Sequence, residues 1–335
     1  MSARVYVIIL NWNGWRDTLS CLESVLRSDY ENLCVIVCDN GSTDGSVMHI
    51  LNWAKTELPG RMETRPLMSS MVMVDATATA RIGPMPDGNL ILLRNPKNLG
   101  FAGGNNAGLR FALARGDFDY AWLLNNDTVV EPSTLTYLVE KMQSSRSAGI
   151  CGSTLLYDHD PERHVRGAIY SKWFARTKLY GALAGAHARI DEDDFARKVD
   201  YVVGASMLVR RRFLEEIGLM SEEYFLYFEE LDWLLRARPN YGFAQASGSI
   251  VHHKGGAATG ATRVTKSVTG EYYGTRSRIL FTRKFYPYAL PTVVLAILVG
   301  AFSQALRGRF KIAITIVIGG RDGLRGRTGV RGKSG

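Results

Sequence analysis

The first half of the chain alternates short apolar runs with longer segments whose apolar residues recur every three or four positions. Apolar runs of strand length occupy residues 4–10, 33–38, 90–94 and 122–124. The segment 15–27 follows the first run and places Leu19, Leu22, Val25 and Leu26 on one helical face. Strands that alternate with helices form a mostly parallel sheet covered by helices. The pattern therefore predicts an α/β fold with a Rossmann-like central sheet flanked by helices.

The second half has a different pattern. Beyond residue 150, Tyr, Arg, His and Gly are scattered among short apolar pieces, which predicts a mixed region that shapes a binding surface. Residues 229–238 predict a helix that ends at Pro239, and residues 272–285 predict a basic helix. The segment 59–89 lacks periodicity and contains several prolines and glycines, so we expect an insertion loop there.

Composition excludes a disordered or fibrous protein. The chain has 335 residues, of which 46% are hydrophobic and 22% charged, enough for a large core. Its four cysteines lack the spacing of metal ligands, and Cys34 and Cys38 lie in an apolar run. Residues 1–10 do not resemble a signal peptide. We therefore expect a protein of the reducing cytoplasm.

The net charge of +9 is concentrated at the end of the chain. Residues 307–335 contain eight basic residues and one acid, +7 of the total, next to apolar runs at 289–302 and 312–318. Neither run reaches the roughly 18–20 residues of a spanning helix, which favours an interfacial element on an anionic membrane surface. A nucleic-acid-binding tail is disfavoured because aliphatic blocks interrupt the cations. A docked helix with a solvated basic face remains an alternative.

Polar loops enriched in Asn, Asp and Gly follow four of the predicted strands, at residues 11–14, 39–45, 98–108 and 125–127. The carboxyl ends of parallel strands meet at one edge of a sheet, where ligands bind. Gly103 and Gly104 lie near a predicted helix start, where backbone amides could approach a phosphate, although a P-loop is absent from the sequence. The loops therefore predict one shared site.

Asn125, Asn126 and Asp127 end the last of these strands. Amide and carboxylate oxygens are ligands for a hard divalent cation, so this stretch predicts Mg²⁺ or Mn²⁺ with a phosphorylated ligand. The alternative is structural, because the same residue types turn a chain and cap helices, here the helix after Pro132.

Taken in order, these motifs resemble glycosyltransferase family 2, inverting nucleotide-sugar enzymes with a GT-A fold, and in particular its rhamnosyltransferase-like branch. The resemblance covers residues 4–285 and rests on 9–13, 38–45, 98–105 and 124–127. It implies a nucleotide-sugar-binding half at 1–150 and an acceptor-binding and catalytic half of the same domain at 151–285. The apolar runs and cations described above make 286–335 a third part, a membrane-associating segment of amphipathic helices.

The resemblance also implies roles for individual residues at the donor site. Asp39 would bind the nucleotide base, Asn11 and Asn13 would line that pocket, and Asn98 and Asn105 would lie near the donor. Asp127 would take the place of the last aspartate of the family's Asp-x-Asp motif and bind a cation that bridges the donor pyrophosphate. This chain has Asn125 where the first aspartate usually stands, so Asn125 and Asn126 would position the donor without neutralising charge.

For the catalytic base, the family has an acidic pair whose second residue removes the acceptor proton. The matching pair here is Glu229 and Glu230, which selects Glu230, with Asp232 as the alternative. A helix dipole alone would also favour acids at this position. His252 or His253 would supply a further ligand to the metal or the diphosphate.

We therefore expect an inverting, metal-dependent transferase that moves a sugar from a nucleotide donor to a saccharide or lipid-linked saccharide, with no nucleic-acid partner. The resemblance favours dTDP-L-rhamnose, with UDP-galactofuranose or UDP-GlcNAc as alternative donors. A nucleotidyltransferase is disfavoured because its glycine-rich phosphate loop is missing. An inactive saccharide-binding homologue would tolerate loss of the acids, which are intact. Homo-oligomerisation remains open.

Overall fold

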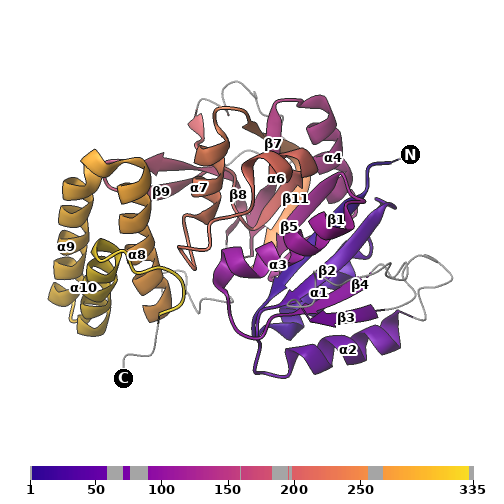
Figure 1. Ribbon diagram of the computed structural model, residues 1–335, viewed down its shortest axis with the longest axis horizontal. Coiled ribbons are helices and arrows are strands. Elements are labelled where there is room, and N and C mark those ends of the chain that lie inside the picture. The colour runs from indigo at the N-terminus through magenta and orange to yellow at the C-terminus, as the bar shows by residue number, and fades with distance from the viewer. Residues whose placement is uncertain are drawn as a thin grey trace.

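The computed structural model describes residues 2–58, 71–75, 90–158, 160–182, 195, 198–255 and 267–331. Their strands form one sheet in the order β3-β4-β2-β1-β5-β10-β7-β11-β6, and β8 pairs with β7 and β9 (Figure 1). The strands are β1 (Val5–Asn11), β2 (Leu33–Asp39), β3 (Met71–Asp75), β4 (Leu90–Arg94), β5 (Tyr120–Asn125), β6 (Thr128–Val130), β7 (Ala148–Tyr157), β8 (Asp160–Ser171), β9 (Arg176–Ala182), β10 (Ser206–Arg210) and β11 (Gly242–His253).

Helices cover both faces of this sheet (Figure 1). They are α1 (Trp15–Val25), α2 (Ser46–Glu57), α3 (Gly100–Arg115), α4 (Thr134–Ser144), α6 (Arg211–Ile217) and α7 (Glu229–Ala237). One core lies between the sheet and α1, α2 and α4, and a second lies between the sheet and α3, α6 and α7. This architecture confirms the predicted α/β fold.

The parallel part of the sheet comprises β3, β4, β2, β1 and β5. Its central strands are buried on both faces, which explains why they read as continuous apolar runs in the sequence. Burial raises the pKa of the Cys34 and Cys38 thiols to about 12, as expected for cysteines of a core strand. Asn11, Asp39 and Asn125 end β1, β2 and β5 at the same edge.

The second half adds antiparallel pairs to this sheet. Strand β10 runs antiparallel to both β5 and β7, and β11 runs parallel to β7. The short β6 pairs antiparallel with the end of β11, so that Thr128 lies opposite His253. This pairing returns the end of β11 to the turn that follows β5.

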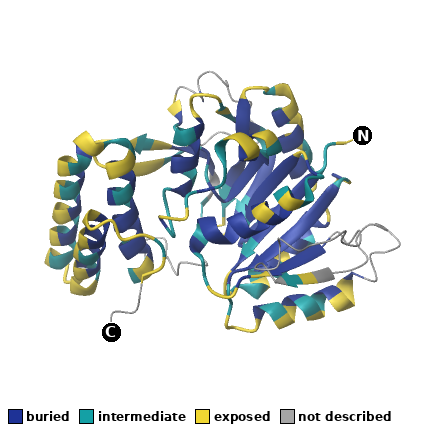
Figure 2. Ribbon diagram, in the orientation of Figure 1, coloured by how far each residue is buried: buried dark blue, intermediate teal, exposed yellow. Residues whose placement is uncertain are grey.

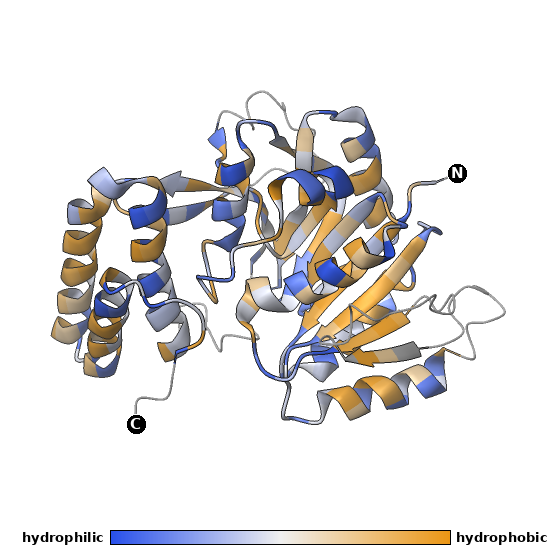
Figure 3. Ribbon diagram, viewed as in Figure 1, coloured by the Kyte–Doolittle hydropathy of each residue, from blue (hydrophilic) through white to orange (hydrophobic). Residues whose placement is uncertain are grey.

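The C-terminal helices pack together beside the sheet, at the left of Figure 1. They are α8 (Val268–Phe285), the 3₁₀ helix η4 (Pro287–Ala289), α9 (Leu290–Leu306) and α10 (Phe310–Leu324). Ile279, Val293, Ile297 and Ile316 bury a small core between them. The outer surfaces of α9 and α10 are exposed and yet largely apolar (Figures 2 and 3).

Two expectations change at this level. Within the predicted insertion, Met71–Asp75 forms the edge strand β3 beside β4, while 59–70 and 76–89 lie outside the described residues. A five-residue edge strand between Pro- and Gly-rich stretches carries too little periodicity to be recognised. The apolar stretch is longer than the predicted run at 289–302, because Pro287–Leu306 forms 20 helical residues that by length and composition are apolar enough to cross a membrane. The interfacial position stays a prediction.

Candidate active site

The ends of β1 and β2 bring the predicted base-pocket residues together. Nδ2 of Asn11 donates a hydrogen bond to Oδ1 of Asp39 over 2.8 Å, and both residues are buried. The backbone amide of Ser42 donates to Oδ2 of Asp39 over 3.2 Å. Oδ1 of Asn13 accepts from the amide of Thr43 over 2.8 Å. These contacts hold the 39–45 loop against the loop after β1.

A chain of hydrogen bonds connects this loop to the turn after β5. Oγ1 of Thr18 donates to Oδ1 of Asn11 over 2.8 Å and accepts from Nδ2 of Asn126 over 3.0 Å. Nδ2 of Asn126 also contacts the carbonyl of Gly14 at 3.3 Å. Thr18 was not predicted as a site residue, because a threonine inside a helix gives no sign that it points at a strand end. It fixes Asn126 relative to Asn11 and Asp39.

The glycine-rich segment serves mainly to bring α3 close to the sheet. Helix α3 begins at Gly100, so Gly103 lies inside the helix, where an added Cβ would be 2.7 Å from Cβ of Leu99. A Cβ at Gly104 would collide with Leu10. The buried position of Gly103 in the first turn of α3 indicates a packing role, and its approach to a donor phosphate stays a prediction.

The two asparagines predicted near the donor have local structural partners. Oδ1 of Asn98 accepts from the Gly100 amide over 2.8 Å and from Nδ2 of Asn40 over 3.1 Å, which shapes the turn into α3. Asn105 is buried, and its Nδ2 donates to the carbonyl of Phe101 over 3.0 Å. Asn40, which was not predicted, links the ends of β2 and β4 through Asn95 and the Leu99 amide.

The structure distinguishes the two histidines. Nε2 of His253 lies 3.2 Å from Oδ1 of Asp127, and both side chains are buried. The His252 side chain is 44% exposed and faces Glu131 at 3.7 Å. Alternation along β11 sends the two rings to opposite faces of the strand, so only His253 reaches the turn after β5. The backbone of Lys254 adds a further link, since its amide donates to the Asp127 carbonyl over 3.0 Å.

The Asp127–His253 pair fits a divalent cation in its donor chemistry. Two neighbouring ligands of an octahedral ion lie about 3 Å apart, which agrees with this separation. No group of three or more His, Cys, Asp or Glu side chains gathers for a metal among the described residues. Two protein ligands leave most coordination positions for water and substrate oxygens, as is usual for a phosphate-bound cation.

The alternative function of the Asn125–Asp127 stretch as a helix cap does not hold. Strand β6 separates the stretch from α4, whose N-cap is Ser133. The stretch does turn the chain, because Oγ1 of Thr128 donates to the carbonyl of Asn125 over 2.7 Å. The turn presents Asp127 to His253 and directs Asn126 inwards.

Glu230 approaches the same region from α7. Its carboxylate packs on Gly204, where an added Cβ would collide with Oε1. The next residue, Ala205, accepts a hydrogen bond from the Asn125 amide over 3.0 Å. Because residue 204 has no side chain, the Glu230 carboxylate can lie beside the start of β10. Strand β10 is the neighbour of β5, which ends at the Asn125–Asp127 turn. Burial raises the pKa of Glu230.

Glu229 and Asp232 have different surroundings. Glu229 is fully buried, and burial followed by the charge of Glu230 raises its pKa well above the ordinary value. Asp232 is also fully buried, but each of its carboxylate oxygens has a charged partner. Oδ1 accepts a hydrogen bond from Nε of Arg236 over 2.7 Å, and Oδ2 accepts one from Nζ of Lys284 over 2.7 Å. The Tyr224 hydroxyl also donates to Oδ2 over 2.8 Å. These partners give Asp232 a structural role that joins α7 to α8.

The loop before α7 is held in an unusual conformation. Phe225, Tyr227 and Phe228 have φ values of 71°, 68° and 78°, a region that non-glycine residues seldom adopt. Helix α8 clamps this loop, since Nη2 of Arg276 donates to the Tyr224 carbonyl over 2.7 Å and Oγ of Ser277 donates to the Leu226 carbonyl over 3.0 Å. Such strain is maintained only where the surroundings impose it, and here it sets the start of α7 and its acids.

Residues 3–275 match the family described as glycosyltransferase-like family 2. The chain belongs to this family. The family predicted from the strand-end motifs is therefore confirmed, and the rhamnosyltransferase-like branch stays a prediction.

Relatives support this assignment. The glycosyltransferase is 24% identical over 244 residues to the low-salt glycan biosynthesis hexosyltransferase Agl10 of Haloferax volcanii, covering 69% of this chain and 75% of Agl10. Its fold is similar to that of the mannosyltransferase PcManGT of Pyrobaculum calidifontis in complex with GDP-Man and Mn²⁺, with a TM-score of 0.54, 15% identity, and coverage of 97% of this chain and 88% of PcManGT. It is also similar to GalNAc-T7 with UDP, GalNAc and Mn²⁺, with a TM-score of 0.50, 13% identity, and coverage of 75% and 44%. These likenesses confirm the GT-A-like fold.

Proposed function

We propose that this glycosyltransferase transfers a hexosyl group from a nucleotide sugar to a saccharide in glycan biosynthesis, with inversion at the anomeric carbon. The observation that carries the proposal is the convergence of an acid with a raised pKa, Glu230, on the strand edge that holds Asp127 and His253. A general base and a diphosphate-neutralising site on one edge are what a single displacement requires.

In this mechanism the Glu230 carboxylate accepts the proton of an acceptor hydroxyl. That oxygen then forms a bond to the anomeric carbon while the bond from this carbon to the donor diphosphate breaks, and the electron pair leaves with the diphosphate. Asp39 and its partners hold the nucleotide. The hydrogen bond from Asn126 to Thr18 ties the turn after β5 to the end of β1. When bound by Asp127 and His253, Mg²⁺ or Mn²⁺ would neutralise charge on the leaving group.

The metal is supported by the chemistry of the Asp127–His253 pair and by the Mn²⁺ in the complexes of PcManGT and GalNAc-T7. The hexosyl group and the role in glycan biosynthesis are supported by the similarity to Agl10, a hexosyltransferase of low-salt glycan biosynthesis. For the donor we propose dTDP-L-rhamnose on the motif resemblance, with UDP-galactofuranose and UDP-GlcNAc as alternatives.

We further propose that α9 and α10 hold the enzyme on an anionic membrane surface, at its cytoplasmic face. Helix α9 is apolar on two sides, because Val293, Ile297 and Ala301 face the small core and a second stripe faces outwards. The outer stripe recurs at helical spacing: Leu295, Leu298, Val299, Phe302 and Leu306. A second exposed stripe on α10 comprises Phe310, Ile314 and Val317.

Charged and aromatic residues flank the α9 stripe as they do at membrane interfaces. Arg307 and Arg309 lie at the turn between α9 and α10, and Lys311 lies in the first turn of α10. At the other end, the exposed rings of Trp173 and Tyr288 meet with their centroids 5.6 Å apart. Cations attract anionic lipid and aromatic rings settle at the headgroup level, which supports an interfacial position. Acceptors linked to lipid would be presented at the same surface.

The test of the catalytic proposal is the release of nucleoside diphosphate from a panel of sugar nucleotides with Mn²⁺ and an acceptor extract. Release is expected from one donor, which we propose is dTDP-L-rhamnose. This release should be lost in Asp127→Ala and in Glu230→Gln. Glu215→Gln is the matched control, because Glu215 pairs with Arg211 on the surface of α6, away from the donor edge. Failure of every donor, or full activity of Glu230→Gln, would contradict the mechanism.

A further inference from the structure

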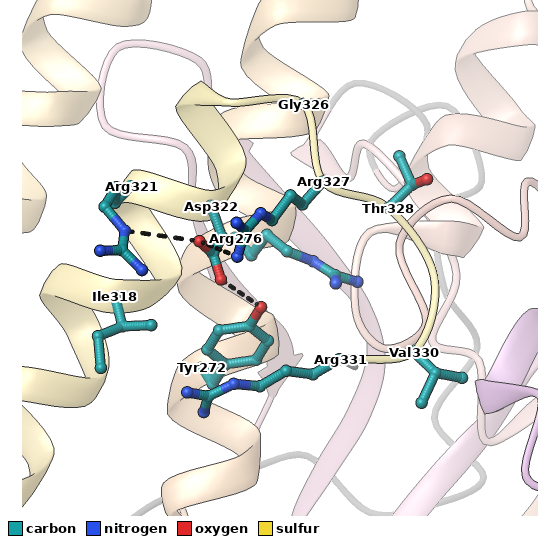
Figure 4. A pocket seen from close by; sticks show the side chains of 10 residues that line it. All are labelled: Tyr272, Arg276, Ile318, Arg321, Asp322, Gly326, Arg327, Thr328, Val330 and Arg331. Atoms are coloured by element: carbon teal, nitrogen blue, oxygen red, sulfur yellow. Dashed lines mark hydrogen bonds and ion pairs between the residues drawn. The ribbon is translucent and has the colours of Figure 1, made fainter. Parts of the chain in front are cut away.

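A basic pocket of about 710 Å³ lies between α8, α10 and the chain that follows α10 (Figure 4). Helix α8 supplies Tyr272 and Arg276, and α10 supplies Ile318, Arg321 and Asp322. The remaining wall comes from residues 326–331, including Arg327 and Arg331. The pocket belongs to neither the donor edge nor the Glu230 region described above.

Charge in this pocket is strongly unbalanced. Four arginines line it, and Asp322 is the one acid among the lining residues. Asp322 is buried and already shared: it accepts from Arg327 at 3.1 Å and from the Tyr272 hydroxyl at 2.8 Å, with Arg321 at 3.7 Å. The lining therefore carries an excess of three positive charges, which a bound anion would offset.

One of the arginines is buried with an unused donor. Arg276 is 1% exposed, and its Nε has no hydrogen-bond partner among the described residues. A buried guanidinium donor without a partner is costly, and an oxyanion in the pocket would supply the missing acceptor. Arginine is also suited to phosphate, because its planar group can donate two parallel hydrogen bonds.

The pocket continues one of the apolar stripes. Phe310, Ile314 and Val317 are exposed along α10, and Arg321 follows at the next helical step on the same face. Ile318, beside this stripe, lines the pocket itself. A molecule with an apolar chain along α10 would therefore place a charged head among the arginines. This combination matches a lipid phosphate better than a free anion.

We propose that this pocket binds the phosphate or diphosphate group of a lipid-linked acceptor, with the lipid chain lying along α10. The inference rests on the proposed transfer to a lipid-linked saccharide and names the feature by which that substrate is recognised. Arg276 connects the pocket to the loop before α7, because its Nη2 donates a hydrogen bond to the Tyr224 carbonyl. The Gly329 amide donates to the Glu223 carbonyl over 3.0 Å, which ties the pocket wall to the same loop.

The experiment measures binding of farnesyl diphosphate to the full chain in detergent micelles by isothermal titration calorimetry. Arg327→Gln combined with Arg331→Gln should weaken binding at least about tenfold, because each variant removes a charge-assisted bond to phosphate. The matched control combines Arg27→Gln with Arg146→Gln, which removes equal charge at exposed positions outside the pocket lining and should leave affinity within about twofold. Equal losses in both pairs would overturn the proposal in favour of non-specific attraction.

Further ligands identify the source of the phosphate. Farnesol should bind far more weakly than farnesyl diphosphate, and inorganic pyrophosphate should compete only at much higher concentration. Equal affinity for inorganic pyrophosphate would overturn the lipid-linked assignment in favour of a free anion, and equal competition by phosphatidylglycerol would overturn it in favour of a membrane headgroup. Unchanged melting temperatures verify that the variants fold.

Donor turnover separates this proposal from the proposed function. Nucleoside diphosphate release by slow donor hydrolysis, without acceptor, should be unchanged in Arg327→Gln/Arg331→Gln, while transfer to a lipid-linked acceptor should fall. Loss of hydrolysis in this pair would overturn the acceptor assignment. An absence of donor turnover in the unmodified enzyme would count against the transferase function alone, because diphosphate binding is measured independently.

Discussion

Nε2 of His253 lies 3.2 Å from Oδ1 of Asp127, although the two residues are far apart in the sequence. The pairing of β6 with β11 produces this contact, since it places His253 opposite Thr128, the neighbour of Asp127. His253 therefore lies beside Asp127, while the adjacent His252 faces Glu131 at the surface.

His253→Ala should raise the Mn²⁺ concentration needed for half-maximal rate by at least about tenfold, because one of the two proposed protein ligands is lost. His252→Ala is the matched control and should leave this concentration unchanged, since His252 faces Glu131 at the surface. The initial rate as a function of Mn²⁺ measures both. Equal effects of the two substitutions would remove His253 from the metal site.

Glu230→Gln should lower kcat/KM by about 100-fold or more, because glutamine cannot accept the acceptor proton. Glu230→Asp keeps a base and should retain part of the rate. Burial raises the pKa of Glu230, and the base works only when deprotonated, so activity of the unmodified enzyme should fall on the acid side with an apparent pKa above the ordinary 4.5. A pH–rate profile with an acid limb at or below that value would contradict the assignment.

Glu229 should make stability depend on pH. Its pKa is raised by burial and by Glu230, so the folded protein binds this proton more tightly than the unfolded chain. The resulting stability is present below the ordinary pKa of 4.5 and is lost as the pH rises through the folded value. Denaturant unfolding between about pH 4 and pH 8 should show a smaller loss for Glu229→Gln than for the unmodified protein. Glu215→Gln should lose as much stability over this pH range as the unmodified protein. An equally large loss in Glu229→Gln would refute this account.

Asp232→Asn should lower the free energy of unfolding by about 3 kcal/mol, because Arg236 and Lys284 lose a buried counter-charge. Chemical denaturation measures the change. Glu215→Gln, which breaks a surface pair, should stay within about 0.5 kcal/mol. If Asp232→Asn left stability intact but abolished transfer, Asp232 would be the better candidate for the catalytic base.

Leu298→Asp combined with Phe302→Asp should abolish sedimentation with anionic vesicles, since burial of each large apolar side chain contributes about 1.5–3 kcal/mol. Both residues lie on the outer stripe of α9, with Leu298 53% exposed. Met48→Asp is the control, because Met48 is similarly exposed, at 59%, but lies on α2 away from the C-terminal helices. Retained sedimentation of the double variant would remove α9 from membrane binding.

Much of the fold and the site could be read from the sequence by itself. Parallel strands buried on both faces are short unbroken apolar runs, and the polar loops after them had to meet at one edge of the sheet. This reasoning predicted that Asn11 and Asp39 lie side by side and that Asn125 lies next to the end of β1. The family could be predicted from the same loops, because each motif is a short continuous stretch of sequence and the motifs follow one another in a fixed order.

Tertiary structure decided what depends on contacts between distant segments. The antiparallel pairing of β6 with β11 placed His253, and not His252, beside Asp127. The packing of α8 paired Asp232 with Lys284, while Glu230 lies against Gly204. Local sequence could not choose among the acids of one helical turn, since their neighbours lie up to 52 residues away. The basic pocket could not be predicted from the sequence either, because it forms only where α8, α10 and the chain after α10 pack together.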